Sequence, residues 1–291
     1  MSVVDKELPF ALIDLMVSVV QALMGAILMG LATGYFALTQ NLEDECQSIP
    51  ENWPGKGSVI FNAVSASYSV DGEPILKGIN MHIKPGEKIC VCGRTGSGKS
   101  SLVMTLLRLL EVTSESSILI DGVDITKVPR QAVRSGINTI PQDSFVMKGA
   151  IRLNASPLQK HSDAEIIDAL GKVRLWPLVE SKGGLDAELD AEFFSPGQKQ
   201  LFCLARALLR KGNIVVMDEV SSSIDVGTDR VIQEVIRQEF DGATIISIAH
   251  RLDNILDFDR IALLSDGQLV EFDNPQVLLN RPAAFRDLYN S

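Results

Sequence analysis

The chain has 291 residues, which suits one large domain or two small ones. Its apolar fraction of 46% and charged fraction of 22% are those of an ordinary globular protein, and they exclude a mostly disordered, collagen-like or multi-span membrane chain. Asp and Glu outnumber Lys and Arg by 37 to 27, and the resulting net charge of −10 argues against general nucleic-acid binding, which needs a basic surface.

A long apolar stretch lies near the start of the chain. Residues 15–38 are 24 consecutive positions without a charge. As a helix they would extend about 36 Å, enough for a bilayer core of about 30 Å. The Asp-Lys-Glu at residues 5–7 is not basic, which argues against a cleaved secretory signal. We therefore expect residues 1–40 to form a membrane segment with a single span; a buried core helix is the alternative.

The next stretch, residues 41–57, has the composition of a linker. It is acidic at first and is then interrupted by Pro50, Pro54, Gly55 and Gly57. We expect the remaining residues, 58–291, to form one large domain.

The four cysteines indicate core positions in a reducing compartment. No two of them have CxxC spacing, and their density is too low for a disulfide scaffold. Cys90 and Cys92 alternate within an apolar run, as residues of a buried strand do, and Cys203 lies among leucines and a phenylalanine. The fourth is Cys46.

Residues 88–110 predict a strand, a glycine-rich loop and, over 101–110, an apolar helix. The strand is Lys-Ile-Cys-Val-Cys at 88–92, and the loop that follows fits the pattern GxxxxGK[ST]. Glycines let backbone N–H groups turn towards phosphates, and the helix N-terminus adds its positive dipole end. Lys99 would contact the β- and γ-phosphates, and the Ser100 hydroxyl would ligate Mg²⁺. The residues expected around the phosphates are Gly93, Arg94, Thr95, Gly96, Ser97, Gly98, Lys99, Ser100 and Ser101. The alternative is a glycine-rich turn that binds nothing.

Two further apolar runs end in polar residues. Residues 214–219 read Ile-Val-Val-Met-Asp-Glu, as expected of a buried parallel strand with its charges at the carboxyl end, where α/β sheets bind ligands. Asp218 is suited to hold Mg²⁺, and Glu219 to polarise an attacking water. A second such strand, residues 244–249, ends at His250, which could reach a γ-phosphate. A plain strand terminus and a structural histidine are the alternatives.

Residues 195–210 predict a helix with a well-capped start. Ser195 suits the N-cap, Pro196 the first turn, and Gln198 completes a capping box. Local physics alone explains these residues. The functional interpretation is an anion-binding helix N-terminus that exposes the Ser195 hydroxyl and the Gly197 amide.

Taken together, residues 58–291 resemble an ATP-binding-cassette (ABC) ATPase, because seven motifs occur in the order typical of that family. The resemblance implies a P-loop NTPase fold of class α/β. This fold has a RecA-like parallel sheet core, an antiparallel β-subdomain and an α-helical subdomain, here preceded by one transmembrane helix. The matched positions are Tyr68 (adenine stacking), residues 93–100 (Walker A), Gln142 (Q-loop, near Mg²⁺ and the transmembrane domain), 195–198 (signature), 214–219 (Walker B), 222–225 with Asp225 (D-loop) and His250 (switch).

The runs at residues 149–157, 183–211 and 249–275 are similar to those of the second nucleotide-binding domain of the C subfamily, the multidrug-resistance-protein-like exporters. The resemblance implies Mg²⁺ and ATP as cofactors, and catalytic roles for Lys99, Gln142, Glu219 and His250. It also implies a second nucleotide-binding domain and transmembrane helices as partners, with the ATPase on the cytoplasmic side. The signature residues Ser195, Pro196, Gly197 and Gln198 would face the nucleotide held by the partner domain.

Two departures from the family pattern matter. Pro196 replaces the first glycine of the signature and supplies no N–H, which implies two unequal nucleotide sites. The family has six spans before this domain, whereas only one is predicted here. An exporter's ATPase is therefore the main hypothesis. An ATP-binding but inactive or regulatory module, and a soluble ABC protein acting on ribosomes or DNA, are the alternatives.

Overall fold

The computed structural model describes residues 49–69, 72–142, 144–190, 192–218, 225–248, 255–282 and 284–289. They belong to the second of two compact units, which divide the chain between Ser48 and Ile49. Within these ranges, no helix is both long and apolar enough to cross a bilayer. The predicted span at 15–38 and the first part of the predicted linker lie outside the described residues, so the span stays a prediction.

The core of the domain is a six-stranded sheet in the order β13-β12-β3-β11-β10-β7. All neighbouring pairs are parallel except β12 and β13. Every described residue of β10 before Asp218 is buried, which explains its continuous apolar run. The strands are β3 (Lys88–Cys92), β7 (Asn138–Ile140), β10 (Ile214–Asp218), β11 (Thr244–Ile248), β12 (Arg260–Ser265) and β13 (Gln268–Asp273).

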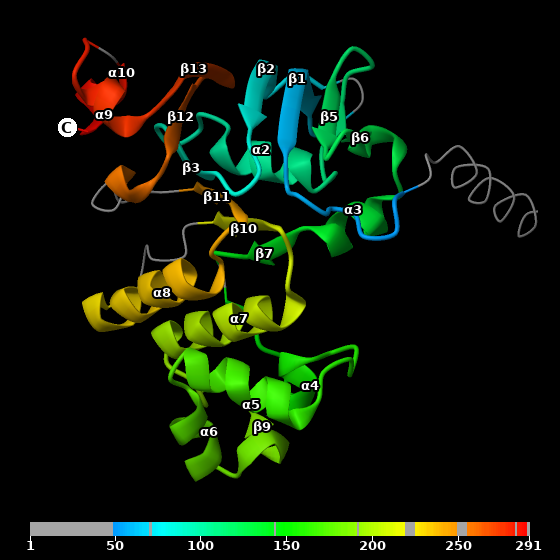
Figure 1. Ribbon diagram of the computed structural model, residues 1–291, viewed down its shortest axis with the longest axis vertical. Coiled ribbons are helices and arrows are strands. Elements are labelled where there is room, and N and C mark those ends of the chain that lie inside the picture. Colours follow the sequence, from blue (N-terminus) through cyan, green and yellow to red (C-terminus); the bar gives the residue numbers. More distant parts are fainter. Residues whose placement is uncertain are drawn as a thin grey trace, which may run out of the picture. The chain divides into compact units, whose positions relative to one another are not determined.

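A smaller antiparallel sheet covers one face of this core (Figure 1). Its strands run in the order β2-β1-β5-β6, with β4 paired to β1. Alternate residues of β10, Ile214 and Val216, share one hydrophobic cluster with this sheet and with α2. The elements on this side are β1 (Val59–Ser67), β2 (Leu76–Ile83), α2 (Lys99–Leu106), β4 (Glu111–Val112), β5 (Ser117–Ile120), β6 (Val123–Asp124) and α3 (Arg130–Gly136).

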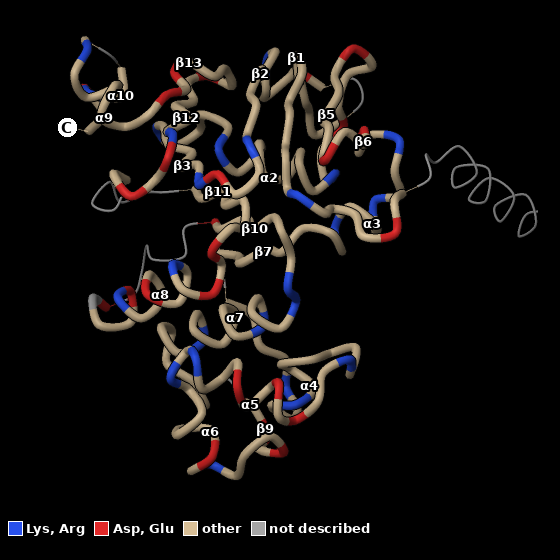
Figure 2. The backbone as a smooth tube through the Cα atoms, viewed as in Figure 1, with Lys and Arg blue, Asp and Glu red and all other residues tan. Residues whose placement is uncertain are grey.

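Helices cover the other face. Val215 and Met217 of β10 point into a second cluster, shared with α7 and α8 and with a helical region that lies beyond them, away from the antiparallel sheet (Figure 1). Basic and acidic residues are interspersed along these elements, for example in α8 (Figure 2). The elements are β8 (Gly149–Ala150), α4 (Ile151–Ala155), α5 (Asp163–Lys172), α6 (Trp176–Ser181), β9 (Glu188–Leu189), α7 (Pro196–Arg210) and α8 (Val226–Glu239). The predicted α/β class with its two subdomains is confirmed.

A third hydrophobic cluster lies on the face of β3 and β12 that carries Cys90 and Cys92. The short helices α9 (Pro275–Leu279) and α10 (Ala284–Tyr289) pack there, with Phe285 fully buried against the two strands. Cys90 and Cys92 belong to this cluster, and burial raises the pKa of the Cys92 thiol to about 12. Cys90, Cys92 and Cys203 are buried thiols that form no disulfide, as predicted for core cysteines; Cys46 lies outside the described residues.

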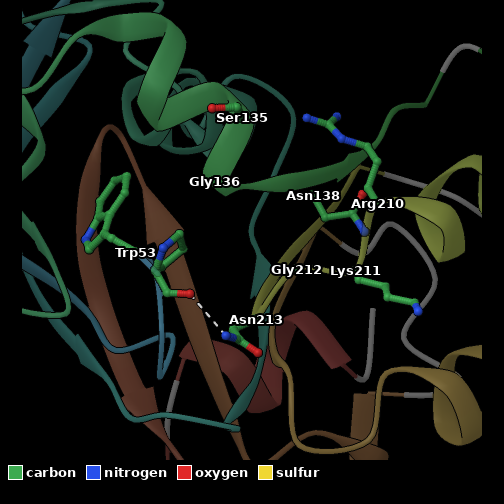
Figure 3. Close-up of a pocket in the computed structure, with 9 residues that line it drawn as sticks. Trp53, Ser135, Gly136, Asn138, Arg210, Lys211, Gly212 and Asn213 are labelled. Carbon is green, nitrogen blue, oxygen red and sulfur yellow. Dashed lines mark hydrogen bonds between the residues drawn. The ribbon is translucent and has the colours of Figure 1, made fainter. Parts of the chain in front are cut away.

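The described end of the predicted linker packs on the amino edge of the central sheet. The indole N–H of Trp53 donates to the Ile120 carbonyl at 2.8 Å, and the Asn213 amide donates to the carbonyls of Pro54 and Gly55, both at 3.0 Å. Beside these contacts is a small polar pocket of about 150 Å³, in which the Lys211 side chain extends away from Trp53 (Figure 3).

Candidate functional site

The loop between β3 and α2 has a left-handed backbone, which favours glycine, at specific positions. Gly93 has a φ of 146° and Gly98 a φ of 100°. A Cβ atom on Gly93 would lie 2.2 Å from the carbonyl oxygen of Leu264, so the close approach of β12 also requires glycine. The loop is held from outside as well, because the Gly267 N–H donates to the Ser97 carbonyl at 3.1 Å. The predicted strand–loop–helix is therefore present, and α2 begins at Lys99.

The Lys99 side chain folds back over this loop. Its ammonium group donates to the carbonyl oxygens of Gly93, at 2.9 Å, and Arg94, at 3.2 Å. Only 6% of the residue is exposed. Its ammonium group is therefore held against the backbone of the loop. Ser97 is also buried, and its hydroxyl has no hydrogen-bond partner within the described residues.

An open pocket of about 290 Å³ joins the loop to Tyr68. Tyr68 directly follows β1 and is 66% exposed, so its ring is available to a ligand. The structure thus brings together residues that the sequence analysis placed at one site. The lining residues are Tyr68, Ile75, Thr95, Gly96, Gly98, Lys99, Ser100 and Ser101. Ile75 is not among the predicted site residues, because it precedes β2 and shows no local pattern that would identify it.

The carboxyl ends of the parallel strands meet beside this loop. Asp218, the last residue of β10, is paired with Ile248 of β11, which is in turn paired with Val91 of β3. On the other side of β10, Met217 pairs with Ile140, and the exposed Gln142 follows two residues later. In the sequence the predicted Glu219 directly follows β10 and the predicted His250 is the second residue after β11, but both lie outside the described residues.

The residues at this edge fit a magnesium ion. Mg²⁺ prefers hard oxygen ligands and is usually held by few protein groups together with substrate phosphates and water. The Ser100 hydroxyl, the Gln142 amide and the Asp218 carboxylate are such ligands. Within the described ranges, no cluster of three or more His, Cys, Asp or Glu residues suggests another kind of metal centre.

The predicted signature residues form the start of α7. The Gln198 N–H donates to the Ser195 hydroxyl at 3.3 Å, and the Ser195 N–H donates to the Gln198 side chain at 3.0 Å, which completes the predicted capping box. None of residues 195–198 lines the pocket beside Lys99. Their local fold is thus explained by capping, and a role towards another nucleotide stays a prediction.

Asp225, the predicted D-loop residue, lies next to this helix start. Asp225 caps α8 by accepting from the N–H and the hydroxyl of Thr228, at 3.0 and 2.7 Å, and these bonds lower the pKa of its carboxyl. A Cβ on Gly197 would lie 3.1 Å from the Thr228 hydroxyl, so the starts of α7 and α8 are in contact.

These features define a P-loop nucleoside-triphosphate-binding domain. Comparison of the chain with known proteins narrows this class. A profile described as ABC transporter matches residues 76–222, about half of the chain, and the chain belongs to that family. It is 46% identical to ABC multidrug transporter B of Aspergillus fumigatus over 254 residues, which are 87% of this chain and 17% of that protein. It is 44% identical to ABC transporter C family member 9 of Arabidopsis thaliana over 241 residues, covering 81% of this chain and 16% of that protein.

A solved structure agrees with this assignment. A bacterial Atm1-family ABC exporter with ATP bound has a TM-score of 0.76 and 30% identity to the chain, and the match covers 84% of this chain and 44% of that one. The described residues thus have the fold of an ABC-transporter nucleotide-binding domain, and the predicted resemblance to the ABC family is confirmed. The chain spans about a sixth of the length of these curated relatives.

Proposed function

We propose that the chain binds Mg·ATP in the pocket between Tyr68 and the 93–101 loop, and that it hydrolyses this ATP to drive export across a membrane. The observation that carries the proposal is the pocket itself, because it places an exposed aromatic ring beside a glycine-rich loop with a buried lysine. Stacking on an aromatic ring suits a base, and the loop N–H groups together with Lys99 suit a polyphosphate.

In this mechanism the protein contributes positioning and charge rather than covalent chemistry. Lys99 would exchange its bonds to the loop carbonyls for bonds to phosphate oxygens. Ser100, Gln142 and Asp218 would hold Mg²⁺, which when bound neutralises charge on the phosphates. Glu219 would orient the attacking water, and His250 would position the γ-phosphate.

The proposed partners are a second nucleotide-binding domain and the transmembrane helices of an exporter. Residues 195–198 would face the nucleotide of that second domain, and Asp225 would lie in the contact between the two domains. Pro196 would weaken the site that this signature serves, since proline supplies no N–H. Residues 1–40 would anchor the chain in the membrane, with the ATPase on the cytoplasmic side and residues 41–57 as the connection.

The test is ATP binding and turnover by the full chain in detergent, with variants of the ring. Tyr68→Ala removes a base-stacking contact of about 1–3 kcal/mol and is expected to raise the Kd for ATP roughly 5- to 100-fold. Tyr68→Phe keeps the ring and is the matched control, with binding close to wild type. Equal affinities for wild type, Tyr68→Ala and Tyr68→Phe would contradict the proposed pocket.

Turnover separates the two main hypotheses. Phosphate release that increases when a first nucleotide-binding domain is added indicates an exporter ATPase. Binding without release under the same conditions indicates the regulatory alternative.

A further inference from the structure

A tight turn between β12 and β13 packs against the phosphate loop, the name used here for residues 93–98. Asp266 and Gly267 form this turn with positive φ values of 49° and 80°, as in a type I′ hairpin. Gly267 is buried, and its N–H donates to the Ser97 carbonyl at 3.1 Å. The turn is therefore fastened directly to the loop.

The same glycine is also attached to the start of β2. Its carbonyl oxygen accepts from the Lys77 N–H at 2.8 Å. Two residues earlier, Ile75 approaches so closely that a Cβ atom on Gly267 would lie 1.9 Å from the Ile75 carbonyl oxygen. Gly267 thus bonds to the phosphate loop through its N–H and to the β2 segment through its carbonyl.

The β2 segment belongs to the part of the pocket that holds the aromatic ring. Ile75 lines the pocket, and its N–H donates at 2.8 Å to the carbonyl of Ala66, which pairs with Leu76 and precedes Tyr68 by two residues. Ile75 and Tyr68 are therefore carried by one hydrogen-bonded part of the antiparallel sheet. The phosphate loop instead follows β3 of the central sheet. The pocket thus has a base half and a phosphate half, which come from two different sheets.

The two halves are in close backbone contact beside Gly267. A Cβ atom on Gly98 would lie 3.0 Å from the Leu76 side chain, 3.6 Å from the Gly267 Cα atom and 3.7 Å from the Ile75 oxygen. Backbone atoms at such distances cannot adapt as the end of a flexible side chain can, because the interior is closely packed. The separation of the halves is therefore determined by backbone packing around Gly267.

We propose that Gly267 is a positioning residue that sets the distance between the base half and the phosphate half of the pocket. A ligand that spans both halves binds with the combined affinity of its parts only where this distance fits the ligand. A ligand confined to one half does not depend on the distance. The proposal rests on the proposed function for the identity of the spanning ligand, ATP.

Titration calorimetry of the full chain in detergent with Mg·ATP, adenosine and Mg·triphosphate tests the proposal. Gly267→Ala must move the turn and the β2 segment apart by about 1 Å, because Cβ contacts below 3.0 Å essentially never occur. The variant is expected to raise the Kd for ATP about ten- to a hundredfold, the scale on which a misplacement of about 1 Å acts. The Kd values for adenosine and for triphosphate are expected to change less than about twofold, since each ligand needs only one half.

The matched control is Gly122→Ala, in the turn between β5 and β6. Asp121 and Gly122 have nearly the same φ values as the proposed pair, 50° and 81°, but a Cβ atom on Gly122 would meet no described atom within 4 Å. Both variants place alanine in a left-handed backbone, which costs about 1–2 kcal/mol. The control is expected to bind all three ligands as wild type does, and urea unfolding of both variants separates a change of position from a loss of stability.

Two results would overturn the proposal. One is an unchanged Kd for ATP in Gly267→Ala. The other is an equal loss of affinity for ATP and for triphosphate, which would locate the damage within the phosphate loop. Wild type that binds none of the three ligands contradicts the proposed function instead, and the proposal for Gly267 falls with it.

Hydrogen exchange of wild type decides the matter if Gly267→Ala does not fold. Mg·triphosphate occupies only the phosphate half, yet it is expected to slow exchange of the Lys77 N–H, which is bonded to Gly267 and not to the loop. Exchange of the Gly122 N–H is expected to stay the same. Unchanged exchange at Lys77 on binding of triphosphate would overturn the proposal.

Discussion

The ammonium group of Lys99 donates a 2.9 Å hydrogen bond to the carbonyl oxygen of Gly93, across the loop that the two residues delimit. The loop is therefore closed by its own lysine. A phosphate that enters competes with carbonyl oxygens for this charge, and it has the advantage of a full negative charge.

Lys99→Met is therefore expected to weaken ATP binding while leaving adenosine binding unchanged. Methionine keeps much of the length of the side chain but has no charge or donor. Loss of a charge-assisted bond of about 1.5–3 kcal/mol raises the Kd for ATP by about ten- to a hundredfold. Calorimetric titrations with ATP and with adenosine check this, and an equal loss of affinity for both ligands would contradict the assignment of Lys99 to the phosphates.

Two glycines of the loop are expected to respond differently to alanine. Gly96→Ala requires a positive φ of 82° but meets no atom within 4 Å, so it costs about 1–2 kcal/mol of stability. Gly93→Ala has the same kind of backbone cost and also places its Cβ 2.2 Å from the Leu264 oxygen, which adds about 1–3 kcal/mol of overpacking. Urea unfolding of the two variants measures which one loses more stability. Equal losses would show that the backbone of β12 moves at Leu264 to accommodate the added methyl group.

The sequence predicts this loop well because its signals are local. A buried strand, three glycines and a helix start lie within a few residues of each other, and each has its own physical cause. The predicted strand matches β3 in both bounds, whereas α2 begins at Lys99 and ends at Leu106 instead of spanning the predicted 101–110. The capping box at Ser195 and Gln198 is likewise local and needs no distant partner.

Contacts between distant segments could not be predicted in this way. Ile75 reaches the pocket only because the chain before β2 approaches Gly267, where a Cβ would lie 1.9 Å from the Ile75 oxygen. Composition alone likewise identifies Trp53 and Pro54 as linker residues, while their bonds to Ile120 and Asn213 depend on the tertiary fold. A single sequence contains no periodic signal for such pairs.

Glu219→Gln is expected to abolish ATP hydrolysis and retain ATP binding. The amide keeps the size of the side chain but cannot polarise water as a carboxylate does. Phosphate release and ATP affinity are measured on the same preparation, with Glu239→Gln as the control, since Glu239 lies at the end of α8 and pairs with Lys172. Unchanged turnover in Glu219→Gln would remove this residue from the proposed mechanism.

The Asp121 carboxylate accepts hydrogen bonds from residues 56–58 at the end of the linker, so the stability of the domain is expected to depend on pH. Burial alone would raise the pKa of its carboxyl, but hydrogen bonds from the N–H groups of Lys56, Gly57 and Ser58, at 2.8, 3.1 and 2.8 Å, outweigh this and lower it. A pKa that is lowered by folding stabilises the folded state above the unfolded pKa, about 3.9, and this contribution is lost as the pH falls through the folded pKa.

Asp121→Asn is therefore expected to destabilise the domain at pH 7, and the difference from wild type is expected to shrink as the pH falls below about 3.9. Both carboxylate oxygens accept N–H groups, and asparagine keeps only one of these acceptors, so the loss at neutral pH combines the charge with one acceptor and only its dependence on pH reports the charge. Urea unfolding of both proteins at pH 7, 5 and 3 checks the trend, with Asp241→Asn as a surface control. A difference that stays constant over this range would show that shape, and not ionisation, holds the linker at Asp121.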